Sequence, residues 1–212
     1  MTARRLMIAA ALAAAAVAAY ACIPGTADLR AFDAARMAQL ETAMWRDYYE
    51  KRYPALFYHL YESTRSQFGF SPLESLRIAL SAAQAARAFQ PTHSRSEADA
   101  ALPHLVTYYG LLRGAAPADF DTNEIARREL DWWQARREAI GPGDYGRTIS
   151  AVAALTYGKS MEQPDLAAFG VARAEAMAYR DARAQNITEA DWSEIERQLR
   201  GAYARLRAGI GG

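Results

Sequence analysis

Residues 188–210 read TEADWSEIERQLRGAYARLRAGI, and this stretch decides the class of fold. Its apolar side chains recur every three or four residues, the spacing that places them on one face of an α-helix. They are Trp192, Ile195, Leu199, Tyr203, Leu206 and Ile210. Thr188 and Asp191 stand where an N-cap and the third helical residue are expected, and Glu196 and Arg200 are spaced for an i,i+4 ion pair away from the apolar stripe. The stretch predicts an amphipathic helix that packs on other helices.

The same signals recur along the rest of the chain, and no useful length alternates with the period of a strand. Residues 71–74 (SPLE) form a capping box, with proline at the first helical position. Gly69, Gly141 and Gly158 stand where helices end in a left-handed residue. The predicted helices span 27–67, 72–90, 95–113, 122–140, 143–157, 164–184 and 189–208. The predicted fold class is all-α, a single-domain helical bundle of about six to seven helices over residues 26–210.

Two features qualify this helix map. Pro54 and Pro103 lie inside predicted helices, where each removes a backbone donor and is expected to kink or split its helix, or to mark its true start. The helix at 164–184 is rich in alanine, and small side chains allow a neighbouring helix to approach closely. We therefore expect this helix to lie centrally, with its charged residues partly buried and paired.

Residues 1–23 have the layout of a signal peptide or an N-terminal membrane anchor. Arg4 and Arg5 precede an unbroken apolar run over residues 6–23. Ala19-Tyr20-Ala21 provides a cleavage site before Cys22, and 18 apolar residues also reach the lower limit for a membrane span. Three outcomes remain open: cleavage and release, an uncleaved anchor, or a lipoprotein acylated at Cys22. All three predict an extracytoplasmic domain, periplasmic or membrane-anchored, because the flanking arginines stay inside.

Charge and cysteine content exclude further classes. The chain has 25 Lys and Arg against 24 Asp and Glu, a net charge of +1. No excess of positive charge is available to neutralise phosphates, so nucleic acid is not a predicted partner. Cys22 is the only cysteine, which excludes an intrachain disulfide and a zinc site built on several cysteines. No cofactor is predicted.

Aromatic residues are concentrated between positions 45 and 70. Such a stretch can line a pocket for an amphipathic ligand, because tyrosine combines an apolar ring with a hydroxyl that needs a partner. The alternative is that these rings form the core of a long helix. We name four of them as candidate ligand-binding residues: Trp45, Tyr49, Tyr53 and Tyr58.

His59 and Glu62 are spaced i,i+3 and are the next candidates for ligand binding. A histidine and a glutamate on one helix face can supply two ligands to a metal. Di-iron carboxylate bundles use Glu-x-x-His, however, and this chain contains only the reverse order. A structural histidine bonded to a neighbour is the simpler interpretation, and no metal ligand is assigned.

A second candidate surface lies in the helix at 122–140. Trp132 with Arg136, and Trp133 with Arg137, are spaced for a guanidinium to stack on an indole. Such a face can bind an anionic ligand or a partner protein, and an ordinary solvated helix explains it as well. We include Trp133 and Arg136 among the candidate ligand-binding residues. The segment 91–96 (PTHSRS) is a weaker candidate, for an anion.

No catalytic pattern fits its context. The letters GPGDYG at 141–146 match G-x-G-x-x-G but join two predicted helices, whereas dinucleotide binding needs a strand before the motif. We therefore expect a binding or interaction domain whose partner is an unknown small molecule or protein, with the membrane as a further partner if the leader is retained or Cys22 is acylated. The alternative is a metal-dependent or ferritin-like redox enzyme that uses His59, Glu62 and carboxylates such as Glu41, Glu129 or Glu175.

Overall fold

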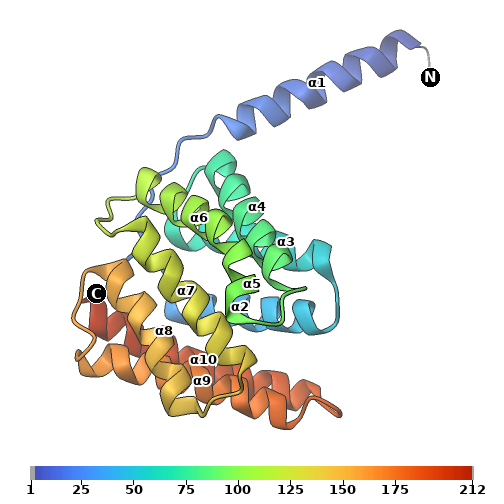
Figure 1. Ribbon diagram of the computed structural model, residues 1–212. Helices are drawn as coiled ribbons and strands as arrows, with labels where there is room; N and C mark the ends of the chain where they lie inside the picture. Colours follow the sequence, from blue (N-terminus) through green and yellow to red (C-terminus); the bar gives the residue numbers. More distant parts are fainter. Residues whose placement is uncertain (1–2, 212) are drawn as a thin grey trace.

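Helices account for all the regular structure in residues 3–211, the part of the chain that the computed structural model describes (Figure 1). They are α1 (Ala3–Ala21), α2 (Ala34–Tyr49), α3 (Tyr53–Phe68), α4 (Pro72–Phe89), α5 (Arg95–Ala98), the 3₁₀ turn η1 (Asp99–Ala101), α6 (Leu102–Ala115), α7 (Thr122–Arg137), α8 (Pro142–Tyr157), α9 (Pro164–Ala182) and α10 (Glu189–Ile210). The all-α prediction is confirmed for these residues.

Nine α-helices follow α1 in the described part of the chain, more than the six to seven predicted. Both additional breaks lie at prolines. The predicted helix 27–67 is split into α2 and α3, with Lys51 at φ 59° in the turn and Pro54 in the first turn of α3. The predicted helix 95–113 is split into α5, η1 and α6, with Pro103 in the first turn of α6. Proline is tolerated there because first-turn N–H groups have no partner within the helix.

The helix ends follow the predicted capping chemistry, with one exception. The capping box at Ser71 is formed in full, and Gly69 and Gly158 end α3 and α8 in the left-handed region, at φ 72° and 60°. Gly141 was predicted to end a helix but is the N-cap residue of α8 instead. Ala139, at φ 53°, takes the left-handed conformation after α7.

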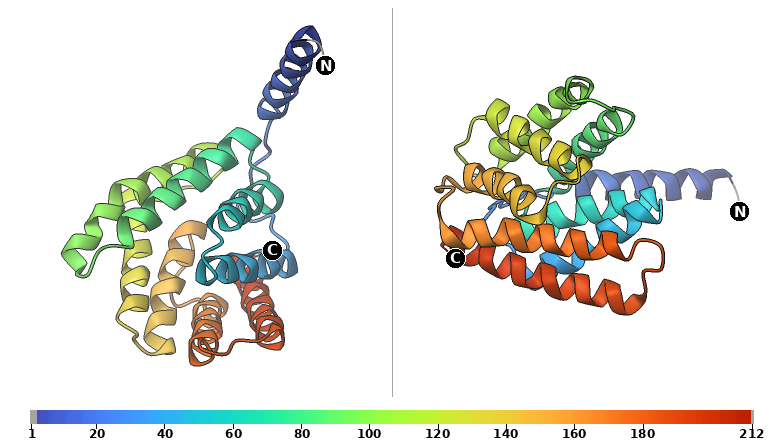
Figure 2. Two further views of the ribbon diagram at one scale, coloured as in Figure 1. Left: turned by 90° about the vertical axis from the view of Figure 1, so that its right-hand side faces the viewer. Right: turned by 60° about the horizontal axis from the view of Figure 1, so that its bottom comes forward.

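Two hydrophobic cores hold the body together. One core lies mainly between α2, α8, α9 and α10, and the other mainly between α4, α6 and α7. Phe68, at the end of α3, and Tyr157, at the end of α8, pack against both cores. Figure 2 shows α9 and α10 side by side along one edge of the body. The domain boundaries 26–210 stay a prediction.

The small residues of α9 allow a close helix contact, as expected, but α9 lies along an edge of the body and not centrally (Figure 2). Gly170 of α9 crosses Gly146 of α8 so closely that a Cβ on Gly170 would collide with the Gly146 carbonyl oxygen and with Ser150 Oγ. Ser150 Oγ also donates to the Leu166 carbonyl oxygen at 2.9 Å. The glycine at the end of the G-x-G-x-x-G match thus serves helix packing.

Helix α1 projects away from the body (Figure 1) and none of its residues is buried. Its length and mean hydropathy of 1.4 suit a membrane span, and an apolar helix near the N-terminus is equally typical of a signal sequence. Cys22, directly after α1, is exposed. Whether the leader is cleaved, retained or acylated stays a prediction.

Candidate functional site

The predicted ligand-binding residues separate into core and surface groups. Trp45 is only 8% exposed and belongs to the core around α9 and α10. Trp133 packs on the other core, where its Nε1 donates to Glu129 Oε1 at 2.9 Å. By contrast, Tyr53 and Tyr58 are 50% and 56% exposed. The two tryptophans therefore contribute mainly to packing, while the two tyrosines are available to a partner.

The exposed rings lie at the end of α2 and in the first two turns of α3. Tyr48, at the end of α2, is also exposed, and burial of part of its side chain raises the pKa of its hydroxyl, with Tyr49 and Tyr53 adding to the rise. The ring of Tyr58 meets the ring of His59 edge-on at 5.5 Å between centroids. We call Tyr48, Tyr53, Tyr58 and His59 the tyrosine corner; here the name means this helical surface and not the β-sandwich motif of the same name. Its phenol hydroxyls can both donate and accept hydrogen bonds.

A buried carboxylate, that of Asp47, holds His59 and Arg52 in place at the tyrosine corner. Asp47 is 2% exposed, and its Oδ2 lies 2.7 Å from His59 Nδ1. Arg52 Nε donates to the other oxygen, Asp47 Oδ1, at 2.9 Å. The Asp47 carboxylate therefore joins α2 to the first turns of α3 and orients the imidazole, as a structural partner of histidine was expected to do. His59 remains partly exposed.

The donors that the metal alternative needs are not brought together. Within residues 3–211, no three side chains of His, Cys, Asp or Glu gather at metal-binding distance. Glu62 forms no ion pair with the described residues, and Glu175 is exposed. Glu41 and Glu129 are each bound elsewhere, by Arg173 and by Tyr109 and Trp133. No observation favours the redox alternative over the binding function.

Tyr49 and Arg136, predicted from separate segments, do come together. Arg136 forms an ion pair with Asp181 Oδ2 at 2.5 Å and donates to the Tyr49 hydroxyl at 3.4 Å. Burial opposes the charged form of Arg136, but the Tyr49 bond and the Asp181 carboxylate raise its pKa. The guanidinium of Arg180 stacks on the Tyr49 ring, 3.2 Å from its centroid. This cluster joins α2, α7 and α9.

A second carboxylate of α2 lies in the core. Glu41 is 3% exposed; Arg173 Nε donates to its Oε1 at 2.7 Å, and the Tyr203 hydroxyl donates to its Oε2 at 2.6 Å. Burial disfavours a charged arginine, yet the Glu41 carboxylate raises the pKa of Arg173. Burial and Glu41 raise the pKa of the Tyr203 hydroxyl well above its ordinary value. Three charged residues of α9, Arg173, Arg180 and Asp181, are partly buried and paired as expected, whereas Glu175 is exposed.

The predicted stacking of arginines on the α7 tryptophans takes a different form. The guanidinium of Arg173 lies 5.1 Å from the Trp132 ring, in the place expected for Arg136. Arg137 lies 3.8 Å from the ring of Phe89 rather than over Trp133. The predicted pairs do not form because Arg136 reaches Asp181 of α9 and Arg137 reaches the Phe89 carbonyl oxygen of α4.

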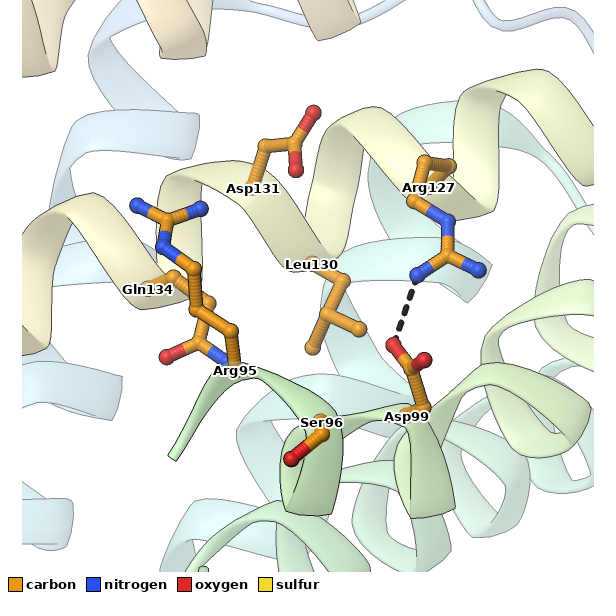
Figure 3. Close-up of a pocket in the computed structure, with 7 residues that line it drawn as sticks. All are labelled: Arg95, Ser96, Asp99, Arg127, Leu130, Asp131 and Gln134. Carbon is orange, nitrogen blue, oxygen red and sulfur yellow. Dashed lines mark hydrogen bonds and ion pairs between the residues drawn. The ribbon is translucent and has the colours of Figure 1, made fainter. Parts of the chain in front are cut away.

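A surface hollow of about 230 Å³ lies between α5 and α7 (Figure 3). It contains Arg95 of the segment expected to hold an anion, together with Arg127. Each arginine already has a carboxylate partner: Arg95 binds Glu138 and Arg127 binds Asp99. An anion entering this hollow meets neutralised guanidinium groups, so the geometry gives the anion prediction little support.

Sequence reasoning missed two residues near the tyrosine corner, Asp47 and Arg52, and it did not predict that Arg180 contacts Tyr49. Asp47 and His59 are twelve positions apart and meet only because the chain reverses between α2 and α3. The proline at position 54 was the available signal, since a break there brings the end of one helix back onto the next. Nothing in the spacing of α9 marked Arg180 as a partner of Tyr49.

Comparison with protein-family models, with curated proteins and with solved structures gives no match for this chain.

Proposed function

We propose that this chain is a non-catalytic binding domain, exported from the cytoplasm, whose tyrosine corner recognises a partner protein. The observation that carries the proposal is the exposure of Tyr48, Tyr53 and Tyr58 on a rigid support. Tyrosine is enriched in protein interfaces because it supplies a large amphipathic contact area with few rotatable bonds.

The support beneath the rings favours recognition over simple exposure. Asp47 holds both His59 and Arg52, so the turn between α2 and α3 that carries the rings is fixed before a partner binds. Contacts that are already ordered lose less conformational entropy on association. The exposed half of Arg52 and the exposed side of His59 add charged and hydrogen-bonding groups at the edge of the rings.

A protein fits this surface better than a small molecule does. Small ligands bind in concave sites that cover most of their surface. The hollow between α5 and α7 is not lined by the corner tyrosines, and neither is a second hollow of about 440 Å³ between α9 and α10. The exposed rings at the turn between α2 and α3 offer contact area on an open surface and do not form a pocket. An open surface of this kind suits a protein interface.

Site-specific photo-crosslinking in the native host tests this proposal. A photoreactive phenylalanine analogue replaces Tyr53 or Tyr58 in the full chain, and Arg205, exposed on α10, is the matched control position. The expected result is a discrete crosslinked species from both corner positions and none from Arg205. The same species should disappear when His59→Ala is combined with the Tyr58 probe.

Two results would contradict the proposal. Crosslinks of equal yield at Arg205 would mean that the corner has no special role. The absence of any crosslink at Tyr53 and Tyr58, with the protein folded and exported, would mean that no partner protein meets this surface. Separate analysis of the membrane and soluble fractions by mass spectrometry shows whether the chain begins at Met1 or at Cys22, which tests the exported location.

A further inference from the structure

The outer face of α4 carries a row of exposed leucines. Leu73, Leu76 and Leu80 are 50%, 40% and 45% exposed and recur at i, i+3 and i+7, so they share one face. Arg77, Gln84 and Arg87 are exposed on the same side of the helix. Large apolar side chains that cluster at the surface mark an interaction site, whereas scattered ones are ordinary.

The charge around this row is one-sided. The only acidic residue of α4 is Glu74, whose carboxylate accepts from the backbone N–H of Ser71 in the capping box. Helix α6, which packs on α4, contains Arg113 and no acidic residue. An apolar row flanked by arginines, with a single acidic neighbour that caps its own helix, is typical of a helix that lies in the interface of a bilayer with anionic lipids.

The position of α1 brings this face toward a membrane. Helix α1 has 19 residues and is therefore about 28 Å long, close to the hydrocarbon thickness of a bilayer. Figures 1 and 2 show that α4 and α6 occupy the end of the body from which α1 projects, and α1 contacts α4. Leu73 and Leu76 lie in the first turns of α4, nearest to that junction.

The linker between α1 and the body is short and is attached at both ends. The Thr26 N–H donates to the Gly69 carbonyl oxygen at 2.9 Å, and Gly25 packs against the backbone of residues 69–71, so the connection outside the body is only residues 22–24. The last turn of α1 is also attached: the Tyr20 hydroxyl lies 2.6 Å from the Tyr61 hydroxyl and accepts from Arg65 Nε at 2.9 Å. Tyrosine and arginine side chains at the end of a membrane helix are typical of the lipid–water interface.

From these observations we propose that α1 is retained as a membrane helix and that the outer face of α4 rests on the surface of an anionic bilayer. Leu73, Leu76 and Leu80 enter the boundary between headgroups and acyl chains, and Arg77 and Arg87 contact the lipid phosphates. The domain is thereby held flat against the membrane with a fixed orientation. This proposal is independent of what the tyrosine corner binds.

Fluorescence quenching in vesicles tests the contact. The full chain with Cys22→Ser receives an environment-sensitive probe on Gln84→Cys, which lies on the face of the leucines and leaves all three in place. The control carries the probe on Ser193→Cys, exposed on α10. Both proteins are reconstituted into phosphatidylcholine vesicles containing phosphatidylglycerol. Lipids with a nitroxide near the headgroup are expected to quench the position 84 probe about threefold more than the control, since interfacial helices sit ~5–10 Å deep.

A second variant separates lipid contact from mere proximity. Replacing the three leucines with serine in the Gln84→Cys protein should return lipid quenching to the control level. Vesicles of phosphatidylcholine alone should reduce it in part, through loss of the arginine contacts. Circular dichroism verifies that the serine variant stays helical; if it does not, the comparison of positions 84 and 193 in the unaltered face still decides.

The proposal is overturned if aqueous iodide quenches the position 84 probe as strongly as the position 193 probe, because the face is then in water or only loosely covered. It is equally overturned if the full chain does not float with the vesicles, since α1 then fails to act as a membrane helix.

Discussion

Helix α2 carries two buried carboxylates, Glu41 and Asp47, that are six residues apart and lie in different surroundings. The partners of Glu41 are interior residues of distant helices, Arg173 of α9 and Tyr203 of α10. The partners of Asp47 are Arg52 and His59, which follow within twelve residues and reach the surface. The first carboxylate links three helices of the core, and the second fixes one corner.

This difference shows why burial alone does not identify a functional site. A buried charge must be paired wherever it lies, so both carboxylates satisfy the same physical requirement. Only the environment of the partners distinguishes them. Glu41 has no route to a ligand, because Arg173 and Tyr203 occupy its oxygens inside the core. Asp47 orients groups that a partner can contact.

The largest expected effect is on Glu41. Glu41→Ala leaves Arg173, whose side chain is 15% exposed, without its carboxylate, and removing one member of a largely buried pair destabilises a protein by about 3–5 kcal/mol. The free energy of unfolding from urea titration measures the loss. The control is the double variant Glu41→Leu/Arg173→Met, which removes both charges and should recover most of the stability. A double variant as unstable as Glu41→Ala would show that the pair is not the source of the effect.

Asp47→Ala should be less harmful. Its partners Arg52 and His59 are partly exposed and become hydrated when the carboxylate is removed, so we expect a loss of about 1.5–3 kcal/mol, the value of hydrogen bonds to a charged group. The same urea titration gives the figure. If Asp47→Ala destabilises the chain as much as Glu41→Ala does, the contrast between the two carboxylates is wrong.

These two sites also show how far sequence reasoning reaches. Helical class, most caps and the effect of Pro54 follow from local chemistry, because apolar spacing and capping residues act within a few positions. The pairing of charged residues on α9 was expected, but Glu41 as the partner of Arg173 was not, since 132 positions separate them. Trp45 and Tyr58 were grouped as ligand-binding residues because they share a segment. Only the packing of α2 and α3 shows that one ring is buried and the other exposed.

A third carboxylate, Glu129, sharpens the comparison because no arginine binds it directly. Tyr109 and Trp133 donate to its oxygens and favour the charged form, but burial outweighs them and raises the pKa of the Glu129 carboxyl. The folded state then keeps the proton at a pH where the unfolded chain has lost it. The contribution of Glu129 to the free energy of unfolding is therefore present when the pH is below the pKa of this carboxyl in the unfolded chain. It is lost as the pH rises through the pKa of the carboxyl in the folded chain.

Glu129→Gln tests this sign. The free energy of unfolding of the unaltered chain, measured from about pH 4 to about pH 7, should contain a component that falls with rising pH and that the variant lacks. Glutamine keeps a carbonyl oxygen for Trp133 or Tyr109, so the fold is retained. A difference between the two proteins that grows in the opposite direction would mean that the hydrogen bonds, rather than burial, dominate at Glu129.

The smallest effect on stability is expected at the tyrosine corner. Tyr53→Ala and Tyr58→Ala remove rings that are half exposed, so the free energy of unfolding should change by no more than about 0.5 kcal/mol. Trp45→Ala, eight positions before Tyr53 but buried, should cost about 3–5 kcal/mol through the cavity it leaves. If the corner is a binding surface, the two tyrosine variants lose the crosslinked partner while keeping the stability of the unaltered chain. Loss of partner capture only in variants that are also destabilised would instead place the aromatic stretch entirely in the core. The corner is thus distinguished from the core by the ratio of binding loss to stability loss, which should be high for Tyr53 and Tyr58 and low for Trp45.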